Sequence, residues 1–154
     1  MCFLSKTRYT IHINSFIKGG GIYMARQQLH LIYEEIGAEK IEELVNAFYP
    51  KVYTDPDLIP IFDIVEIDEI MHKQQLFLTQ FTGGPALFSK EFGPPRMRYR
   101  HLPHEITPTR ARAWLGCMKE AFQEVGIWDM AVGQEFYKRL TEVAAIMVNT
   151  EEVE

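Results

Sequence analysis

The stretch GPALFSKEFGPPRMRYRHLPHEIT, residues 84–107, decides the fold, because it separates two pairs of predicted helices. It is irregular and rich in proline, glycine and basic residues, so little regular packing is expected in it. A connection of more than 20 residues is too long for an ordinary loop of a helical bundle. Something other than helix packing must therefore order this segment.

Two helices are predicted before it. Residues 38–53 place apolar side chains on one helix face, with a kink or tightening expected at Pro50. Residues 66–81 form the second helix, and the connector 58–62 is expected to be kept out of regular helix by Pro60. The apolar stripes of the two helices consist of Ile41, Leu44, Val45, Phe48, Tyr49 and Val52, and of Ile70, Gln74, Phe77, Leu78 and Phe81.

Two more helices are predicted after the central segment. Thr107 and Pro108 suit the N-cap and first position of a helix that runs to about residue 126. The last helix covers about residues 130–148. The body shows no internal repeat and no β-type alternation, so the sequence predicts an all-α domain over residues 31–154.

Composition excludes several classes of protein. The 154 residues are 47% hydrophobic and 24% charged with a net charge of −5, so a nucleic-acid partner is not expected. No run approaches the roughly 18 consecutive apolar residues of a membrane span. Two cysteines, Cys2 and Cys117, form no disulfide framework or zinc knuckle. We expect a cytoplasmic protein with no membrane partner.

Three polar side chains lie on these apolar stripes. Gln74, Tyr49 and Trp114 each direct a hydrogen-bonding group inward from a different predicted helix. Each has an ordinary explanation alone, since Gln74 can reach water from the stripe's edge and Tyr or Trp is common core material. Together they favour a site that binds a small polar ligand in a dry pocket.

The basic segment allows several interpretations. His101 alone is commonly a structural residue, and with His104 it makes half a zinc site that no cluster of Cys, Asp or Glu completes. Arg98, Arg100 and Lys73 can form a solvated face or surround a bound anion. Nucleophile-elbow and phosphate-loop motifs are absent from the sequence, which argues against hydrolase and nucleotide-binding functions.

Taken together, these motifs resemble those of the group II truncated haemoglobins over about residues 32–150. The resemblance implies a two-over-two helical sandwich around one haem b, in which an extended loop replaces most of the helix before the proximal histidine. The cofactor would then order the central segment. The motifs that carry it are Phe48-Tyr49, Phe62, Lys73-Gln74, Phe77-Leu78, Phe81-Thr82-Gly83-Gly84-Pro85, Arg98-Tyr99-Arg100-His101-Leu102-Pro103 and Ala113-Trp114-Leu115.

The resemblance also assigns roles to residues. His101 matches the proximal ligand of the iron, which is its one expected protein ligand. Ile70 and Pro50 depart from the family pattern, since Ile70 stands where the family often has a smaller or hydroxylated residue and Pro50 directly follows Tyr49. The remaining matches are Tyr49, Gln74 and Trp114 as distal polar residues, Phe62, Ile70, Phe77 and Met97 as haem-packing residues, and Lys73 and Arg100 as partners of the propionates.

The implied function is binding of O2 and other diatomic ligands such as NO or CO at a five-coordinate iron. Distal donors slow O2 release, which suits scavenging, sensing or redox chemistry such as nitric oxide dioxygenation or peroxide reduction better than transport. Such chemistry requires a reductase, and the protein is expected to be a monomer or homodimer. The alternative is a non-haem helical interaction module with structural inward polar groups. A carboxylate-bridged di-metal bundle lacks the two E-x-x-H motifs it needs.

The first 30 residues differ from the body in charge. They carry four basic residues and no acid, so the net charge divides into +4 there and −9 over residues 31–154. We expect residues 1–30 to be an extension outside the fold. We do not expect a signal peptide, because the apolar run in this segment is short and interrupted by polar residues and no cleavage site follows it. One explanation is that this segment corresponds to sequence that is not translated in the native protein. The alternative is that it is a basic targeting or docking arm.

Translation is predicted to start at Met24. The codons of Lys18 to Gly21 form a purine run able to contain a bacterial ribosome-binding sequence just upstream of it. The intact mass of the natively expressed protein should correspond to a chain beginning at or directly after Met24. A mass that includes residues 1–23 contradicts this start.

Overall fold

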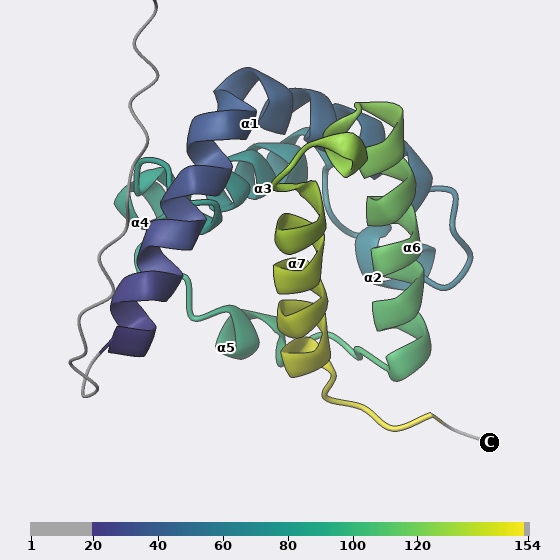
Figure 1. Ribbon diagram of the computed structural model, residues 1–154. Coiled ribbons are helices and arrows are strands. Elements are labelled where there is room, and N and C mark those ends of the chain that lie inside the picture. The colour runs from purple at the N-terminus through teal and green to yellow at the C-terminus, as the bar shows by residue number, and fades with distance from the viewer. Residues whose placement is uncertain (1–19, 153–154) are drawn as a thin grey trace, which may run out of the picture.

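The computed structural model describes the backbone of residues 20–152 and the side chains of residues 32–152. Figure 1 shows that this part of the chain is built from helices joined by loops, and it contains no strand. The predictions for residues 1–19 lie outside the described residues. Residues 20–30 are described only as helical backbone, so the proposed domain boundary at residue 30 stays a prediction.

The helices follow one another along the chain in the order α1 to α7. Their bounds are α1 Gly20–Val52, α2 Ile59–Phe62, α3 Ile67–Phe81, α4 Leu87–Phe92, α5 Met97–His101, α6 Pro108–Glu124, the 3-10 helix η1 Ile127–Asp129 and α7 Gly133–Met147.

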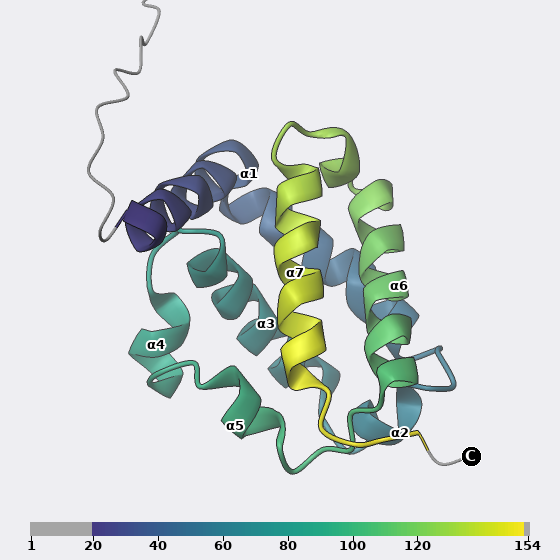
Figure 2. The same cartoon turned by 60° about the horizontal axis from the view of Figure 1, so that its bottom comes forward.

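Two pairs of long helices form the body. Helix α1 contacts both α3 and α6, and α6 contacts α7. Figures 1 and 2 show α6 and α7 side by side, with α1 crossing behind their upper ends. None of the helices in residues 20–152 combines the length and apolarity that crossing a bilayer requires. The predicted all-α two-over-two sandwich is confirmed.

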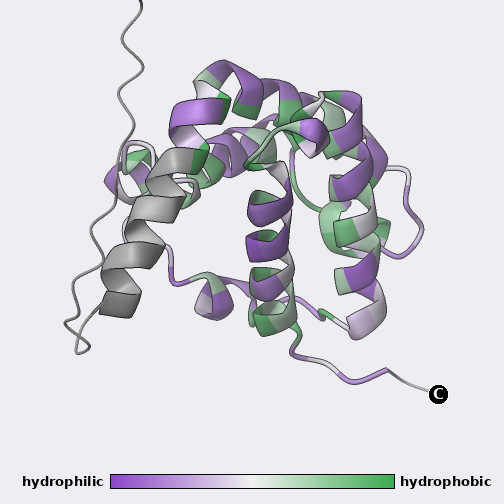
Figure 3. Cartoon of the chain, viewed as in Figure 1, coloured by the Kyte–Doolittle hydropathy of each residue, from purple (hydrophilic) through white to green (hydrophobic). Residues whose placement is uncertain are grey.

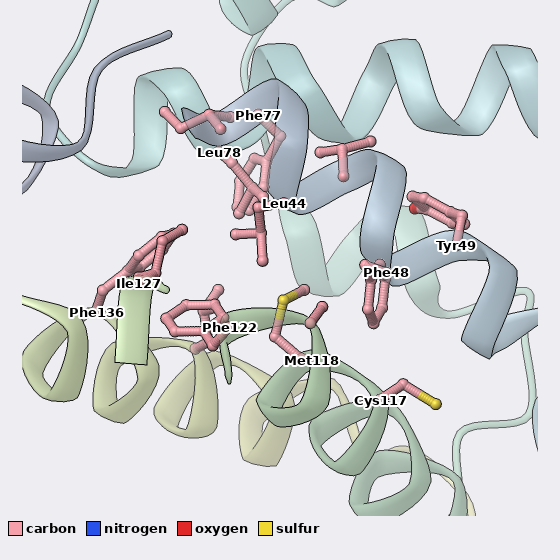
Figure 4. Close-up of a cluster of buried hydrophobic side chains, with 14 of the residues drawn as sticks. Leu44, Phe48, Tyr49, Phe77, Leu78, Cys117, Met118, Phe122, Ile127 and Phe136 are labelled. Carbon is pink, nitrogen blue, oxygen red and sulfur yellow. The ribbon is translucent and has the colours of Figure 1, made fainter. Parts of the chain in front are cut away.

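Apolar faces of these helices meet in a single core. Figure 3 shows polar and apolar residues alternating along α6 and α7, as expected of helices with one inward face. In Figure 4, side chains from α1, α3, α6, η1 and α7 point toward one another, and most of those labelled are essentially inaccessible to solvent. The labelled members of this core are Leu44, Phe48, Tyr49, Phe77, Leu78, Cys117, Met118, Phe122, Ile127 and Phe136.

The bend in α1 occurs at Gly37 and not at Pro50. Gly37 has a φ of 74°, outside the helical region, and divides α1 into two helical parts. Pro50 is exposed and lies in the last turn, where the Tyr53 amide donates to the Tyr49 carbonyl at 3.0 Å and the hydrogen-bonding pattern resumes. A proline so close to a helix end disturbs few bonds, so no kink forms there. The alternative, an early tightening, is what the structure shows, because the amides of Thr54 and Asp55 donate to carbonyls three residues back.

The connecting segments contain more helix than predicted. Residues 59–62 form α2 with Pro60 in its first turn, where the missing N–H needs no partner. The expectation that Pro60 keeps this connector out of helix is therefore wrong. The central segment is mostly loop, as predicted, but includes the short helices α4 and α5. Thr107 caps α6 as predicted, its hydroxyl accepting from the Arg110 amide at 3.2 Å.

The turn after α3 places two parts of the chain in close contact. The amide of Tyr33 donates to the carbonyl of Thr82 at 3.0 Å, which joins α1 to the end of α3. A Cβ on Gly84 would lie 2.7 Å from the Thr79 carbonyl oxygen and 2.7 Å from the Tyr33 ring. Glycine is required at position 84 because the backbone and the ring leave no room for a side chain.

We therefore predict that Gly84→Ala destabilises the protein by about 1 to 3 kcal/mol, since the new methyl group overlaps backbone and ring. Gly116→Ala is the matched control, because a Cβ there meets nothing within 4 Å in the interior of α6. That control should gain about 0.5 to 1 kcal/mol from helix propensity. Urea unfolding measures both, and equal changes in the two variants would contradict the close packing at Gly84.

Candidate functional site

A cavity of about 1020 Å³, counting its open mouth, lies inside the sandwich. Residues from α1, α2, α3, α5, α6 and α7 line it, and most of them are apolar. The lining of the cavity therefore suits a mainly apolar ligand that also contacts a few polar groups.

Most residues predicted for the site line this cavity. Lys73 and Arg100 are the two that do not. The lining residues include His101, Tyr49, Gln74, Trp114, Phe62, Ile70, Phe77 and Met97. Side chains from the predicted helix stripes and from the central segment thus line one cavity, although these segments are well separated along the chain.

His101 ends the short helix α5 and is half-buried. Its Nδ1 donates to the carbonyl of Met97, one turn earlier, at 2.6 Å. Burial lowers the pKa of this imidazole, the Met97 hydrogen bond opposes that effect, and nearby His104 lowers the pKa further. The ring is therefore mainly neutral near pH 7, and its Nε2 lone pair is available for a metal.

The residues present fit a haem. Within residues 32–152, no group of three or more His, Cys, Asp or Glu side chains could hold a metal ion. A single neutral imidazole in an apolar cavity suits an iron that brings its own equatorial ligands, as a porphyrin provides. The hydrogen bond on Nδ1 is the usual orienting contact for a ligating histidine.

Tyr49 is the most deeply buried polar residue of the cavity wall. It is 1% exposed, and its hydroxyl donates to Gln74 Oε1 at 3.4 Å, a long hydrogen bond. Burial, with a smaller contribution from Tyr53, raises the pKa of Tyr49 far above the physiological range. The hydroxyl therefore stays protonated and can donate to a ligand that approaches more closely than Gln74.

Trp114 comes to the cavity from α6. Its ring packs edge-on against Phe48, with centroids 5.2 Å apart. Trp114 is half-buried, and its indole N–H makes no hydrogen bond within the described residues, where every buried side-chain nitrogen and oxygen has a partner. This N–H is therefore accessible and can donate to a ligand in the cavity.

Aromatic side chains hold the wall formed by α2 and the α2–α3 loop. Phe62 contacts Tyr49 and Tyr53, with ring centroids 6.3 and 6.2 Å apart. The Tyr53 hydroxyl donates to the Val65 carbonyl at 2.7 Å. Burial, followed by Glu66 and Asp63, raises the pKa of Tyr53 and keeps this donor protonated. Tyr53, directly after α1, thus holds two cavity residues in place, Phe62 of α2 and Val65 of the α2–α3 loop.

Lys73 and Arg100 contact other parts of the protein. The Lys73 ammonium lies 2.5 Å from Glu69, and this hydrogen bond lowers the pKa of the Glu69 carboxyl. Arg100 Nε donates to Pro95 at 2.9 Å, and its Nη2 donates to Phe92 at 2.6 Å and to Pro94 at 3.2 Å, all to backbone carbonyls. Arg100 thereby braces the loop between α4 and α5.

Two polar residues of the cavity were not predicted. Arg110 and His104 both line it. Arg110 Nη1 donates to the Glu105 carbonyl at 2.6 Å. The spacing of four between Arg110 and Trp114 places them on one face of α6, and this signal was available in the sequence. His104 follows Pro103 outside any periodic element, so no pattern indicated its direction.

Comparison with known proteins gives the family. The sequence model of the bacterial-like globins matches residues 31–149. The chain is 44% identical over 128 residues to Group 2 truncated hemoglobin YjbI from Bacillus subtilis, covering 83% of this chain and 96% of that one. It therefore belongs to the group II truncated haemoglobins.

Solved structures agree with this assignment. The group II truncated haemoglobin of Bacillus anthracis superposes with a TM-score of 0.73 at 47% identity, covering 79% of this chain and 92% of that one. A truncated oxygen-avid haemoglobin of Bacillus subtilis gives a TM-score of 0.71 at 47% identity, with 76% and 98% covered. The fold and the family are thus supported by independent comparisons.

Proposed function

We propose that this chain binds haem b through His101 and holds O2 beside Tyr49, Gln74 and Trp114. One observation carries the proposal: a single cavity brings together an oriented neutral imidazole and the polar side chains of Tyr49, Gln74 and Trp114 on a mainly apolar wall. Membership of the truncated haemoglobins supports the cofactor. The oxygen-avid relative from Bacillus subtilis supports O2 as a ligand.

When bound, haem supplies an iron that takes up a diatomic ligand at its open coordination position. His101 would hold the iron through Nε2, because the Met97 carbonyl keeps its ring in one tautomer. Phe62, Ile70, Phe77 and Met97 offer apolar surface for the porphyrin faces and exclude water from them.

The polar side chains act on the bound ligand. Trp114 offers an indole N–H, Tyr49 a hydroxyl and Gln74 an amide, whereas Ile70 has no donor. O2 gains negative charge when it binds, so each hydrogen bond stabilises it by about 1 to 3 kcal/mol. Release is then slow, which suits scavenging, sensing, nitric oxide dioxygenation or peroxide reduction better than bulk transport.

The haem propionates need cationic partners at the cavity mouth. Lys73 and Arg100 stay our proposal for this role. Among the described residues Arg100 Nη1 has no hydrogen-bond partner and can pair with a carboxylate, since Nε and Nη2 make the three contacts with backbone carbonyls. Lys73 has a compact ammonium on a flexible stem and can exchange Glu69 for a propionate.

The cellular setting follows from the same chemistry. Redox turnover requires electrons, so a reductase partner belongs to the proposal. Cys117 is a free buried thiol, and burial above all raises its pKa to about 11, so it stays protonated and unreactive. A free thiol suits the cytoplasm.

The alternative of a non-haem interaction module is not favoured, because it leaves the cavity and the family match unexplained.

Replacing the proximal histidine tests cofactor binding. Purified wild-type protein should be red, with an intense absorption at about 400 nm. His101→Ala should lose or grossly alter this band, because His101 is the proposed iron ligand. His104→Ala is the matched control, since His104 lines the same cavity, and its spectrum should stay close to wild type. A colourless wild-type protein, or the reverse order of the two variants, overturns the proposal.

Removing a distal donor tests ligand stabilisation. Trp114→Phe and Tyr49→Phe should each accelerate O2 dissociation by roughly 5- to 150-fold, the equivalent of about 1 to 3 kcal/mol, and should speed autoxidation. CO carries less negative charge when bound, so its dissociation should change less. Stopped-flow release of both gases measures this difference. Equal effects on O2 and CO would show that these side chains block access and do not donate hydrogen bonds.

A further inference from the structure

Helix α5 carries His101, and side-chain packing holds it only in part. Met97 packs against the core and Arg100 lies over the Phe88 ring, but none of the five residues is fully buried, and the N-cap Arg96 has a φ of 39° and makes no side-chain capping bond. Isolated helices this short are unstable in water. The position of the His101 backbone therefore depends in part on polar contacts with neighbouring segments.

Those contacts come largely from the chain that follows α7. The Asn149 amide nitrogen Nδ2 donates to the His101 carbonyl at 3.1 Å and to the His104 carbonyl at 2.9 Å. Its Oδ1 accepts from the Ile106 amide at 3.0 Å, and its backbone amide donates to the Ile106 carbonyl at 3.0 Å. In Figure 2 this tail runs beside the loop between α5 and α6.

We infer that Asn149 is a positioning residue, which sets the placement of the His101 imidazole by holding the His101 carbonyl. The inference rests on the proposed function, in which His101 binds the haem iron. Nδ1 of the ring bonds to the Met97 carbonyl, and Asn149 bonds to the carbonyl of His101 itself. The ring and the backbone of the same residue are thus each held by a hydrogen bond.

An amide is the side chain that this position requires. Both N–H donors and the oxygen acceptor of Asn149 are in use, so all of its main hydrogen-bonding groups contribute. A carboxylate would still accept from Ile106 but would place a negative charge against the His101 and His104 carbonyls. Replacing Asn149 by Asp therefore keeps the contact with Ile106 and removes the contacts with the His101 and His104 carbonyls, so the two contributions can be measured separately.

A second contact supports the first without replacing it. Arg98 Nη1 donates to the carbonyls of Ile146 and Val148 at the end of α7. It holds α5 at its middle, one turn from the His101 carbonyl. Loss of Asn149 should therefore free the end of α5 that bears the imidazole while the rest of the helix stays attached to α7.

The test compares Asn149→Ala and Asn149→Asp with wild type as haem-loaded proteins. The control Asn46→Ala makes the same chemical change at an exposed position of α1. Three quantities are measured: the iron–histidine stretching band in resonance Raman spectra of the ferrous protein, the rate of haem transfer to excess apomyoglobin, and the urea midpoint of each haem-free protein.

We expect both Asn149 variants to shift or broaden the iron–histidine band and to transfer haem about tenfold faster, as the loss of two hydrogen bonds predicts. Asn46→Ala should match wild type in all three measurements. A fall in the urea midpoint with an unchanged band and transfer rate would show a merely structural role. A wild-type-like Asn149→Asp would show that only the Ile106 contact matters, and either result overturns the inference. A wild-type chain that takes up no haem instead refutes the proposed function.

Discussion

The hydrogen bond between His101 Nδ1 and the Met97 carbonyl orients the one imidazole of the site, and it lies within a helix that buries none of its residues. A functional group on so short an element needs support from outside. Arg100 binds three carbonyls of the preceding loop, and Asn149 binds two carbonyls of the following one. In the α4–α6 region, guanidinium and amide contacts with backbone carbonyls therefore add to the packing of Phe88 and Met97, whereas the long helices are ordered mainly by apolar packing.

The sequence predicted the long helices and the cavity because both follow from helical periodicity. Apolar residues spaced three and four apart define a face, and Gln74 and Trp114 share that face with core residues, so their inward direction could be read directly. Tyr49 follows the same rule, and its 1% exposure shows how deeply the stripe is buried. These residues lie on helices whose local geometry depends little on the rest of the protein, so their direction could be predicted from their spacing.

Features that depend on the exact backbone could not be predicted in the same way. The effect of a proline depends on its place in the turn, so Pro60 begins α2 and Pro50 lies within the last turn of α1. The direction of a long cationic side chain depends on which carbonyls lie nearby. Arg110, which has a helical neighbour in Trp114, was predictable in principle, whereas the partners of Asn149 are set by tertiary contacts more than 40 residues away.

The distal side of the cavity combines burial with incomplete hydrogen bonding. Tyr49 is fully buried whereas Gln74 and Trp114 are half-buried, and burying a hydroxyl costs free energy unless it finds a partner. The Tyr49–Gln74 bond is long at 3.4 Å and satisfies only part of this need, and Trp114 contacts Phe48 through its ring and not through its N–H. Ile70, one turn before Gln74 on α3, adds apolar surface and offers no donor. Tyr49, Gln74 and Trp114 thus offer donors to a ligand, and a small ligand with a partial negative charge satisfies them better than an apolar one. The selectivity of the site therefore comes from the few polar groups on its wall, while the two-over-two fold determines only where they meet.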